Sequence, residues 1–321
     1  MRSGTGLGTA AVLLAALLWG TTGTAAAFAP GVSGLAVGAA AMGLGGLLQA
    51  AAAAPQVRRY RGALRMQWPT VAVSAVAVAV FPLAFYSSMR LTGVAVGTVV
   101  TIGSAPPAAA LIERAMDGTR LSRRWALGTG LGVLGVTALA LAHSDPSGTG
   151  TATTGGWGHV AGIGLGLLGG ATYALYSWGA ARVIRTGIPS RASMGAIFGL
   201  GAVLLMPVLV LTGSTIVATR VNLAVVAYLA LIPMFLGYVL FGRGLASVSA
   251  STATTLSLAE PAAAAVIAML VLHEQLTGVA TAGLVLLFAS LAATTLAPRP
   301  TSAASRPVRR GTIMREPLER A

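Results

Sequence analysis

The sequence predicts an all-α integral membrane protein with ten transmembrane helices, arranged as two inverted five-helix repeats. Three observations support this fold class: 55% of the residues are hydrophobic and only 9% charged, the basic residues gather in alternate gaps between long apolar segments, and the two halves of the chain resemble each other. With a mean hydropathy of +0.82, the chain has too few polar residues to cover a water-soluble fold of 321 residues. Lipid is therefore its expected solvent.

Apolar segments bounded by charges, prolines and glycines place the ten helices in order, each about as long as the roughly 20 residues that a bilayer requires. The first segment follows Arg2 and imitates a cleaved signal peptide, but it is long enough to span and completes the first repeat, so we expect it to be retained. The expected spans are residues 7–29, 34–53, 69–89, 93–113, 124–142, 158–181, 192–213, 222–242, 247–272 and 276–296.

The arginines orient these spans, because basic residues accumulate in cytoplasmic loops. All 21 basic residues are arginine, and with a cytoplasmic N-terminus only Arg90 and Arg220 fall in outside loops. We therefore expect a multi-pass protein of the cytoplasmic membrane with both termini in the cytoplasm. Anionic lipid headgroups are the expected partner of the net charge of +14.

An internal duplication divides the chain. The stretch GSAPPAAA at residues 103–110 resembles LSLAEPAAAA at 256–265, each about a helix length after an arginine. Five helices per repeat is an odd number, so the second repeat must enter the membrane upside down, and the arginines follow the membrane side rather than the repeat position. The expected divisions are a cytoplasmic N-terminus (1–6), a first repeat (7–142), an external linker (143–157), a second repeat (158–296) and a disordered Arg-rich tail (297–321).

Several short motifs in this order resemble the EamA-type members of the drug/metabolite transporter superfamily. They are Leu18-Trp19-Gly20, Glu260-Pro261, the run HEQLT at residues 273–277, and Gly283 in the closing helix. Two features depart from the family pattern: residues 39–43 lack the arginine common in the second helix, and Thr119 stands where the second copy has Glu274. The resemblance implies ten helices in two repeats and secondary transport of a small metabolite, often export.

Glu260 is the sharpest candidate site residue, because a carboxylate in mid-membrane must be protonated, paired or exposed to a watery cavity. Its functional interpretation is binding of a substrate amine or of a coupling proton, and the alternative is a carboxyl group that hydrogen-bonds a neighbouring helix for packing. Prolines cannot donate a backbone hydrogen bond, so we expect helix breaks at Pro106, Pro107 and Pro261, where the carbonyls of Ile102, Gly103 and Ser257 are freed to line a cavity.

Aromatic residues form the second group of candidates, since amphipathic rings can line a cavity for a flat substrate. These are Trp19, Tyr86, Tyr173, Tyr176 and Tyr238, for which core or interfacial packing is the stronger alternative. Glu113 and Asp117 are expected to pair locally with cytoplasmic arginines. Glycines spaced by four, such as Gly128 with Gly132 and Gly195 with Gly199, predict close helix packing.

The remaining residues argue against other functions. Cysteine is absent and the three histidines are far apart, which excludes thiolate metal sites and gives no metal-ligand motif; we expect no cofactor. The arginines lie beside apolar segments, which argues against nucleic acid. We expect no catalytic residue and no enzyme activity, but a secondary transporter that moves a small organic metabolite, an amino acid or similar compound, outward by alternating access. A proton gradient or the membrane potential is its expected driving force. A membrane enzyme acting on a lipid-linked substrate and a receptor or scaffold are the alternatives, and a homodimer is one candidate assembly.

Overall fold

The computed structural model describes residues 3–29, 31–92, 94–119, 122–142, 156–272 and 278–295, and within these ranges all regular structure is helical. Residues 143–155 of the expected linker, the HEQLT run and residues 296–321, which include the tail, lie outside the described residues, whereas residues 156–157 of the linker begin a helix. Among the described residues, seven helical segments are long and apolar enough to cross a membrane, by length and composition. They cover the first to fourth and the sixth to eighth expected spans.

The first half of the chain supplies helices α1 to α7. Their bounds are α1 Ser3–Gly20, α2 Thr22–Ala27, α3 Gly34–Arg59, α4 Arg61–Met66, α5 Trp68–Thr92, α6 Val94–Asp117 and α7 Arg123–Ala142. Helices α3 and α6 extend a turn or more beyond their expected spans, and α4 is a short helix in the expected loop between the second and third spans.

The second half begins with α8 Gly156–Arg185, α9 Ser190–Thr212 and the 3-10 turn η1 Gly213–Thr215. The eighth expected span is a composite of α10 Arg220–Leu229, the π-helix η2 Ala230–Leu236 and α11 Gly237–Leu245. The ninth consists of α12 Ala250–Leu256 and α13 Ala259–Leu272, and the tenth is α14 Gly278–Thr295.

The helix breaks differ from those expected. Helix α6 runs unbroken through Pro106 and Pro107, which corrects the predicted break there. Losing two hydrogen bonds costs less than interrupting a helix in lipid, where each unsatisfied backbone group costs several kcal/mol. Pro261 lies in the first turn of α13, where a missing N–H leaves no bond unmade. The break precedes it at residues 257–258, and the carbonyl of Ser257 is not free, because it accepts from the N–H of Glu260 at 2.9 Å.

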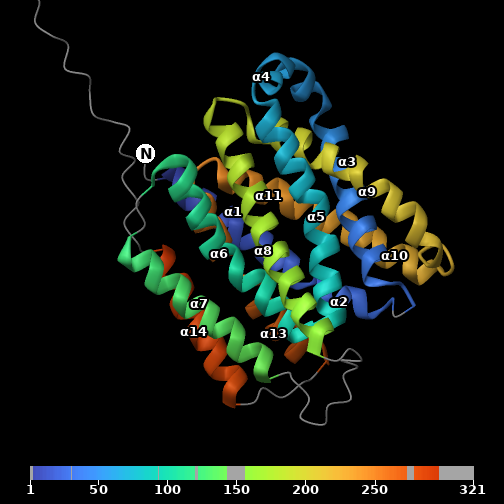
Figure 1. The fold of residues 1–321 in the computed structure, drawn as a ribbon, viewed down its shortest axis with the longest axis vertical. Helices are drawn as coiled ribbons and strands as arrows, with labels where there is room; N and C mark the ends of the chain where they lie inside the picture. Colours follow the sequence, from blue (N-terminus) through green and yellow to red (C-terminus); the bar gives the residue numbers. More distant parts are fainter. Residues whose placement is uncertain are drawn as a thin grey trace, which may run out of the picture.

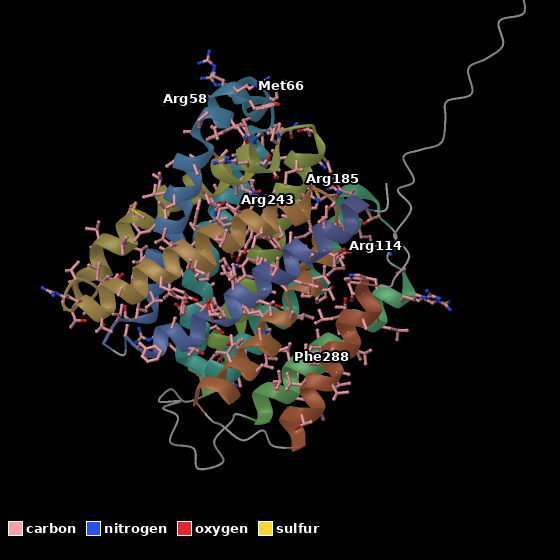
Figure 2. The ribbon with its side chains drawn as sticks, turned by 180° about the vertical axis from the view of Figure 1, so that it is seen from behind. Arg58, Met66, Arg114, Arg185, Arg243 and Phe288 are labelled. Carbon is pink, nitrogen blue, oxygen red and sulfur yellow. The ribbon has the colours of Figure 1, made fainter. Side chains whose placement is uncertain are left out.

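Helices of the two halves pack against each other throughout the molecule (Figure 1). The most extensive contacts between the halves are those of α3 with α9, α5 with α8, α7 with α14 and α6 with α8. Contacts of α5 with α9, α1 with α11 and α13, α3 with η2, and α6 with α12 are smaller. In Figure 1, α7 and α14 run side by side along one edge. Figure 2 shows Arg58, Arg185 and Arg243, all from expected cytoplasmic segments, in the upper half of the view, whereas Phe288 of α14 lies lower and is exposed.

Glycines allow several of these close approaches, as their spacing predicts. A Cβ atom at Gly132 would lie within 3 Å of Ser290 Oγ on α14, and one at Gly199 would lie 2.7 Å from the Cβ of Ala50 on α3. At Gly135 the obstacle is backbone: a Cβ would lie 2.8 Å from the carbonyl oxygen of Gly283. The pair α7 and α14 therefore has no room for a side chain at this crossing.

Substituting alanine at two glycines of α7 should separate packing from helix propensity. Gly135→Ala should lower the thermal unfolding midpoint in detergent, because overpacking against a backbone costs about 1–3 kcal/mol. Gly130→Ala is the matched control: nothing lies within 4 Å of its added Cβ, and alanine stabilises a helix interior by roughly 0.5–1 kcal/mol over glycine. Equal midpoints for the two variants would contradict the α7 and α14 packing.

Candidate functional site

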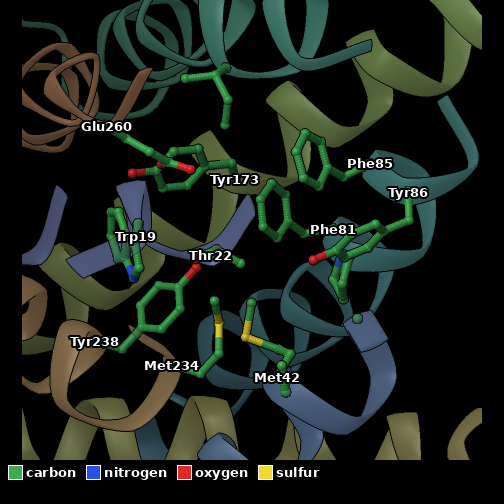
Figure 3. A pocket seen from close by; sticks show the side chains of 14 residues that line it. Trp19, Thr22, Met42, Phe81, Phe85, Tyr86, Tyr173, Met234, Tyr238 and Glu260 are labelled. Carbon is green, nitrogen blue, oxygen red and sulfur yellow. The ribbon is translucent and has the colours of Figure 1, made fainter. Parts of the chain in front are cut away.

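A cavity lies among helices of both halves, at the level of the break between α12 and α13 (Figure 3). Its empty volume is about 540 Å³, a figure that includes space open to solvent. Most of its wall is apolar. The lining residues are Trp19, Thr22, Gly38, Ala41, Met42, Phe81, Pro82, Phe85, Tyr86, Ile102, Tyr173, Met234, Tyr238 and Glu260.

Among the described residues, Glu260 supplies the only carboxylate of this wall. It is the second residue of α13, directly after the break, and its side chain is partly exposed to the cavity rather than fully covered. Within the described ranges, no hydrogen bond or ion pair holds its carboxylate. The packing alternative, a carboxyl group bonded to a neighbouring helix, therefore has no partner to support it in these parts of the chain.

Trp19 is fixed in position by the irregular helix η2. Its Nε1 donates a hydrogen bond of 3.0 Å to the carbonyl oxygen of Pro233. Its ring centroid lies 4.9 Å from that of Tyr238 and 5.3 Å from that of Phe241. The indole is therefore locked in position and presents a ring face, rather than a free donor, to the cavity.

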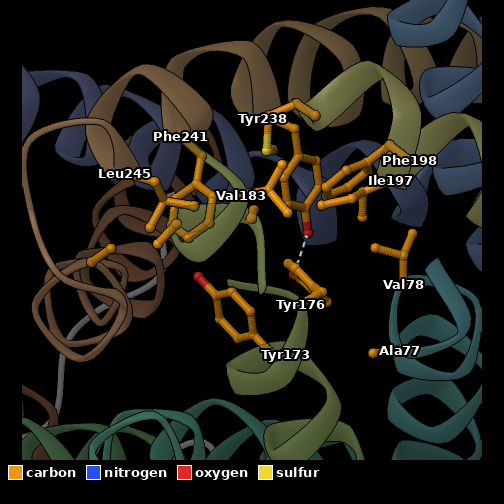
Figure 4. Close-up of a cluster of buried hydrophobic side chains, with 14 of the residues drawn as sticks. Ala77, Val78, Tyr173, Tyr176, Val183, Ile197, Phe198, Tyr238, Phe241 and Leu245 are labelled. Atoms are coloured by element: carbon orange, nitrogen blue, oxygen red, sulfur yellow. Dashed lines mark hydrogen bonds between the residues drawn. The ribbon is translucent and has the colours of Figure 1, made fainter. Parts of the chain in front are cut away.

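The tyrosines divide into those that line the cavity and one that supports it. Tyr173 lines the cavity and donates from its hydroxyl to Ser257 Oγ at 2.8 Å, beside the break that positions Glu260. Tyr238 also lines it and shares a 2.8 Å hydrogen bond with Tyr176 (Figure 4). Tyr176 is itself buried behind the wall against Phe198, so it is a core residue that orients Tyr238.

Tyr86 lies on α5 against two glycines of α3. A Cβ atom at Gly38 would lie 2.6 Å from the Tyr86 ring, so the missing side chain makes room for the ring at the cavity edge. Sequence reasoning missed the neighbouring lining residues Thr22, Met42, Phe81, Phe85 and Met234. Phe81 and Phe85 are spaced by four on α5 with stacked rings, a pattern that could have marked one helix face.

A polar cluster joins the halves at the end of the molecule that carries the expected cytoplasmic arginines. Asp117 at the end of α6 accepts from Arg182 at 3.1 Å, from Arg185 at 2.8 Å and from Trp178 Nε1 at 3.0 Å, all on α8. Its partners are arginines, as expected, but they lie in the other half of the chain rather than nearby in sequence.

Glu113 corrects the expectation that it pairs with arginine. It is 2% exposed, and its carboxylate accepts from the backbone N–H of Ala250 at 2.7 Å and from Ser251 Oγ at 2.5 Å. Both partners belong to the start of α12. Helix α6 of the first half is thus fastened to α12 and, through Asp117, to α8 of the second half.

Comparison with known proteins identifies this architecture. A model described as the EamA-like transporter family matches residues 160–296. A curated relative from Bacillus subtilis (strain 168), described as the uncharacterized transporter YwfM, is 35% identical over 289 residues, which cover 90% of this chain and 93% of the relative. The chain belongs to the EamA-like transporter family. A solved structure titled "Crystal structure of protein" shares the fold of this EamA-like chain, with a TM-score of 0.74 at 20% identity over 92% of this chain and 97% of that one.

Membership of the EamA family makes this chain a multi-pass membrane transporter of the drug/metabolite transporter superfamily. The family match covers the half that contains Glu260, Tyr173 and Tyr238, whereas Trp19 and Tyr86 come from the first half. The cavity of this EamA protein therefore combines residues of both halves.

Proposed function

We propose that this EamA protein is a ten-helix secondary carrier that exports a small organic metabolite across the cytoplasmic membrane by alternating access. The observation that carries the proposal is the cavity between the halves, with the single carboxylate of Glu260 on its wall. A buried site shared by two halves of a transporter is where rocking of one half against the other changes access.

Numbering the expected spans from one to ten, the pairs two with seven, four with nine and five with ten map onto themselves when the halves are swapped. One with eight exchanges with three with six, four with six exchanges with one with nine, and three with seven exchanges with two with eight. Exchanging the two halves therefore reproduces the same set of contacting spans, as a pseudo-twofold axis requires.

The position of the cavity relative to the polar cluster supports alternating access. With a cytoplasmic N-terminus, α5 runs outward, so Phe85 and Tyr86 lie in its outer half, while α6 returns and brings Asp117 to the cytoplasmic side. We infer an outward-facing state, in which the contacts of Glu113 and Asp117 with α8 and α12 close the cytoplasmic side.

Reconstitution into liposomes tests the proposal. We expect saturable counterflow of at least one radiolabelled probe among amines, amino acids, nucleosides and sugars, each assayed separately with the same compound loaded inside. Empty liposomes are the control. Chemical conversion of a probe would instead favour an enzyme, and counterflow of none of them, with folded protein, would contradict the carrier.

A further inference from the structure

We propose that the cavity selects an organic monocation with a flat apolar body, such as a protonated aromatic amine, and rejects anions and zwitterions. This inference rests on the proposed function, because it assigns the substrate class of the same cavity. It follows from the charges on the wall, the ring faces, and the hydrogen-bond donors that remain free.

The wall of the cavity carries a negative but no positive side chain among the described residues. Among its residues Glu260 is acidic and none is basic. The chain contains no lysine, His159 is exposed on the first turn of α8, and Arg182 and Arg185 are already paired with Asp117. A cationic ligand therefore has a partner in this cavity, whereas an anionic group meets no positive side chain along the wall.

The wall also offers ring faces around the carboxylate. Trp19, Phe81, Phe85, Tyr86, Tyr173 and Tyr238 all contribute to it. In Figure 3 the carboxylate of Glu260 lies beside the Tyr173 ring, with Trp19 and Tyr238 below it. Cations are attracted to aromatic faces by about 2 kcal/mol when desolvated, so the rings reinforce the preference set by Glu260.

Most polar hydrogens of the wall already take part in hydrogen bonds within the protein. Trp19 Nε1 donates to Pro233, Tyr173 donates to Ser257, and Tyr238 shares its hydroxyl with Tyr176. The hydroxyls of Thr22 and Tyr86 remain, together with that of Tyr238 where Tyr176 is the donor, and all three are neutral. The carboxylate of a zwitterionic amino acid would be desolvated against at most these three side-chain hydroxyls, which leaves much of its hydration uncompensated.

A series of matched ligands tests this assignment on the purified full-length protein. The probes are 2-phenylethylamine, 2-phenylethanol, 3-phenylpropionate and phenylalanine, which share a phenyl ring and differ in charge. Binding is measured at neutral pH by the ligand-induced rise of the thermal unfolding midpoint and by quenching of tryptophan fluorescence. We expect the amine to bind about tenfold or more tightly than the alcohol, with the propionate and phenylalanine weakest.

Glu260→Gln supplies the matched variant, and we expect it to bring the affinity for the amine down to that for the alcohol. Equal or tighter binding of phenylalanine by the wild type, or an amine preference that persists in Glu260→Gln, would overturn the assignment. The wild-type series decides the matter alone if the variant does not fold. Amine binding without any counterflow would contradict the carrier but not the assignment, and counterflow of other solutes with no amine binding would do the reverse.

Discussion

Glu260→Gln should reduce counterflow by at least about 30-fold, because removing one partner of a buried charge contact costs roughly 2–5 kcal/mol. Glutamine keeps the size and shape of the side chain but can neither carry a proton nor attract a cation as strongly. The carboxylate has no partner within the described residues, so its replacement breaks no contact that holds the helices there. Transport in proteoliposomes should fall while the thermal unfolding midpoint stays close to that of the wild type.

Glu260→Asp is the matched control, since it retains the charge and shortens the side chain by one methylene. We expect it to keep part of the activity and its dependence on pH, because a titratable carboxylate remains on the same cavity wall. A Glu260→Gln protein with wild-type rate and wild-type pH dependence would exclude both roles of Glu260, substrate binding and proton coupling.

Asp117→Asn combined with Glu113→Gln should open the cytoplasmic side of the cavity. The substitutions remove the charge from two ion pairs and from the bonds to the start of α12. The arginines are nearly half exposed, so each pair contributes only about 0.2–1 kcal/mol. Together with the weakened Glu113 bonds, the expected shift in the ratio of the two states is roughly 10-fold.

Accessibility of the cavity measures this shift. The chain has no cysteine, so a single Phe85→Cys on the wall reports labelling by an impermeant thiol reagent without background. We expect faster labelling from the cytoplasmic side in inside-out vesicles and slower labelling in right-side-out vesicles. Arg191→Gln is the control, because this exposed arginine at the start of α9 has no ion pair among the described residues. Unchanged labelling from both sides would contradict the closing role.

Residues of the site could be recognised from sequence because polar and aromatic side chains are scarce inside the apolar spans. Glu260, Trp19, Tyr86, Tyr173 and Tyr238 were each singled out for this reason, and the structure brings all five to one cavity. Tyr176 shares their chemistry but is buried behind the cavity wall. The sequence could not separate it from the others, because a nearly uniformly apolar helix carries no periodic signal for the side that faces a cavity.

Long-range partners and helix irregularities could not be predicted from sequence. The bonds from Asp117 to α8 and from Glu113 to α12 join residues 65 and 137 positions apart, which depend on how the halves dock. Proline suggests a break, yet α6 continues through Pro106 and Pro107 while η2 adopts π-helical form around Pro233. Packing in lipid decides between these outcomes, and the residue type alone does not.

The π-helical turn of η2 gives the eighth span about one residue more than an α-helix of the same length, and every side chain after it is turned by roughly 100° around the axis. Winding the same residues as a regular α-helix would turn Tyr238 and Phe241 away from Trp19, which their rings now contact at centroid distances of 4.9 and 5.3 Å. Deleting one residue between Ala230 and Leu236 would instead remove the surplus and leave the orientation of the following side chains unchanged. The wide turn thus absorbs one residue of chain length while it keeps Tyr238 on the cavity wall.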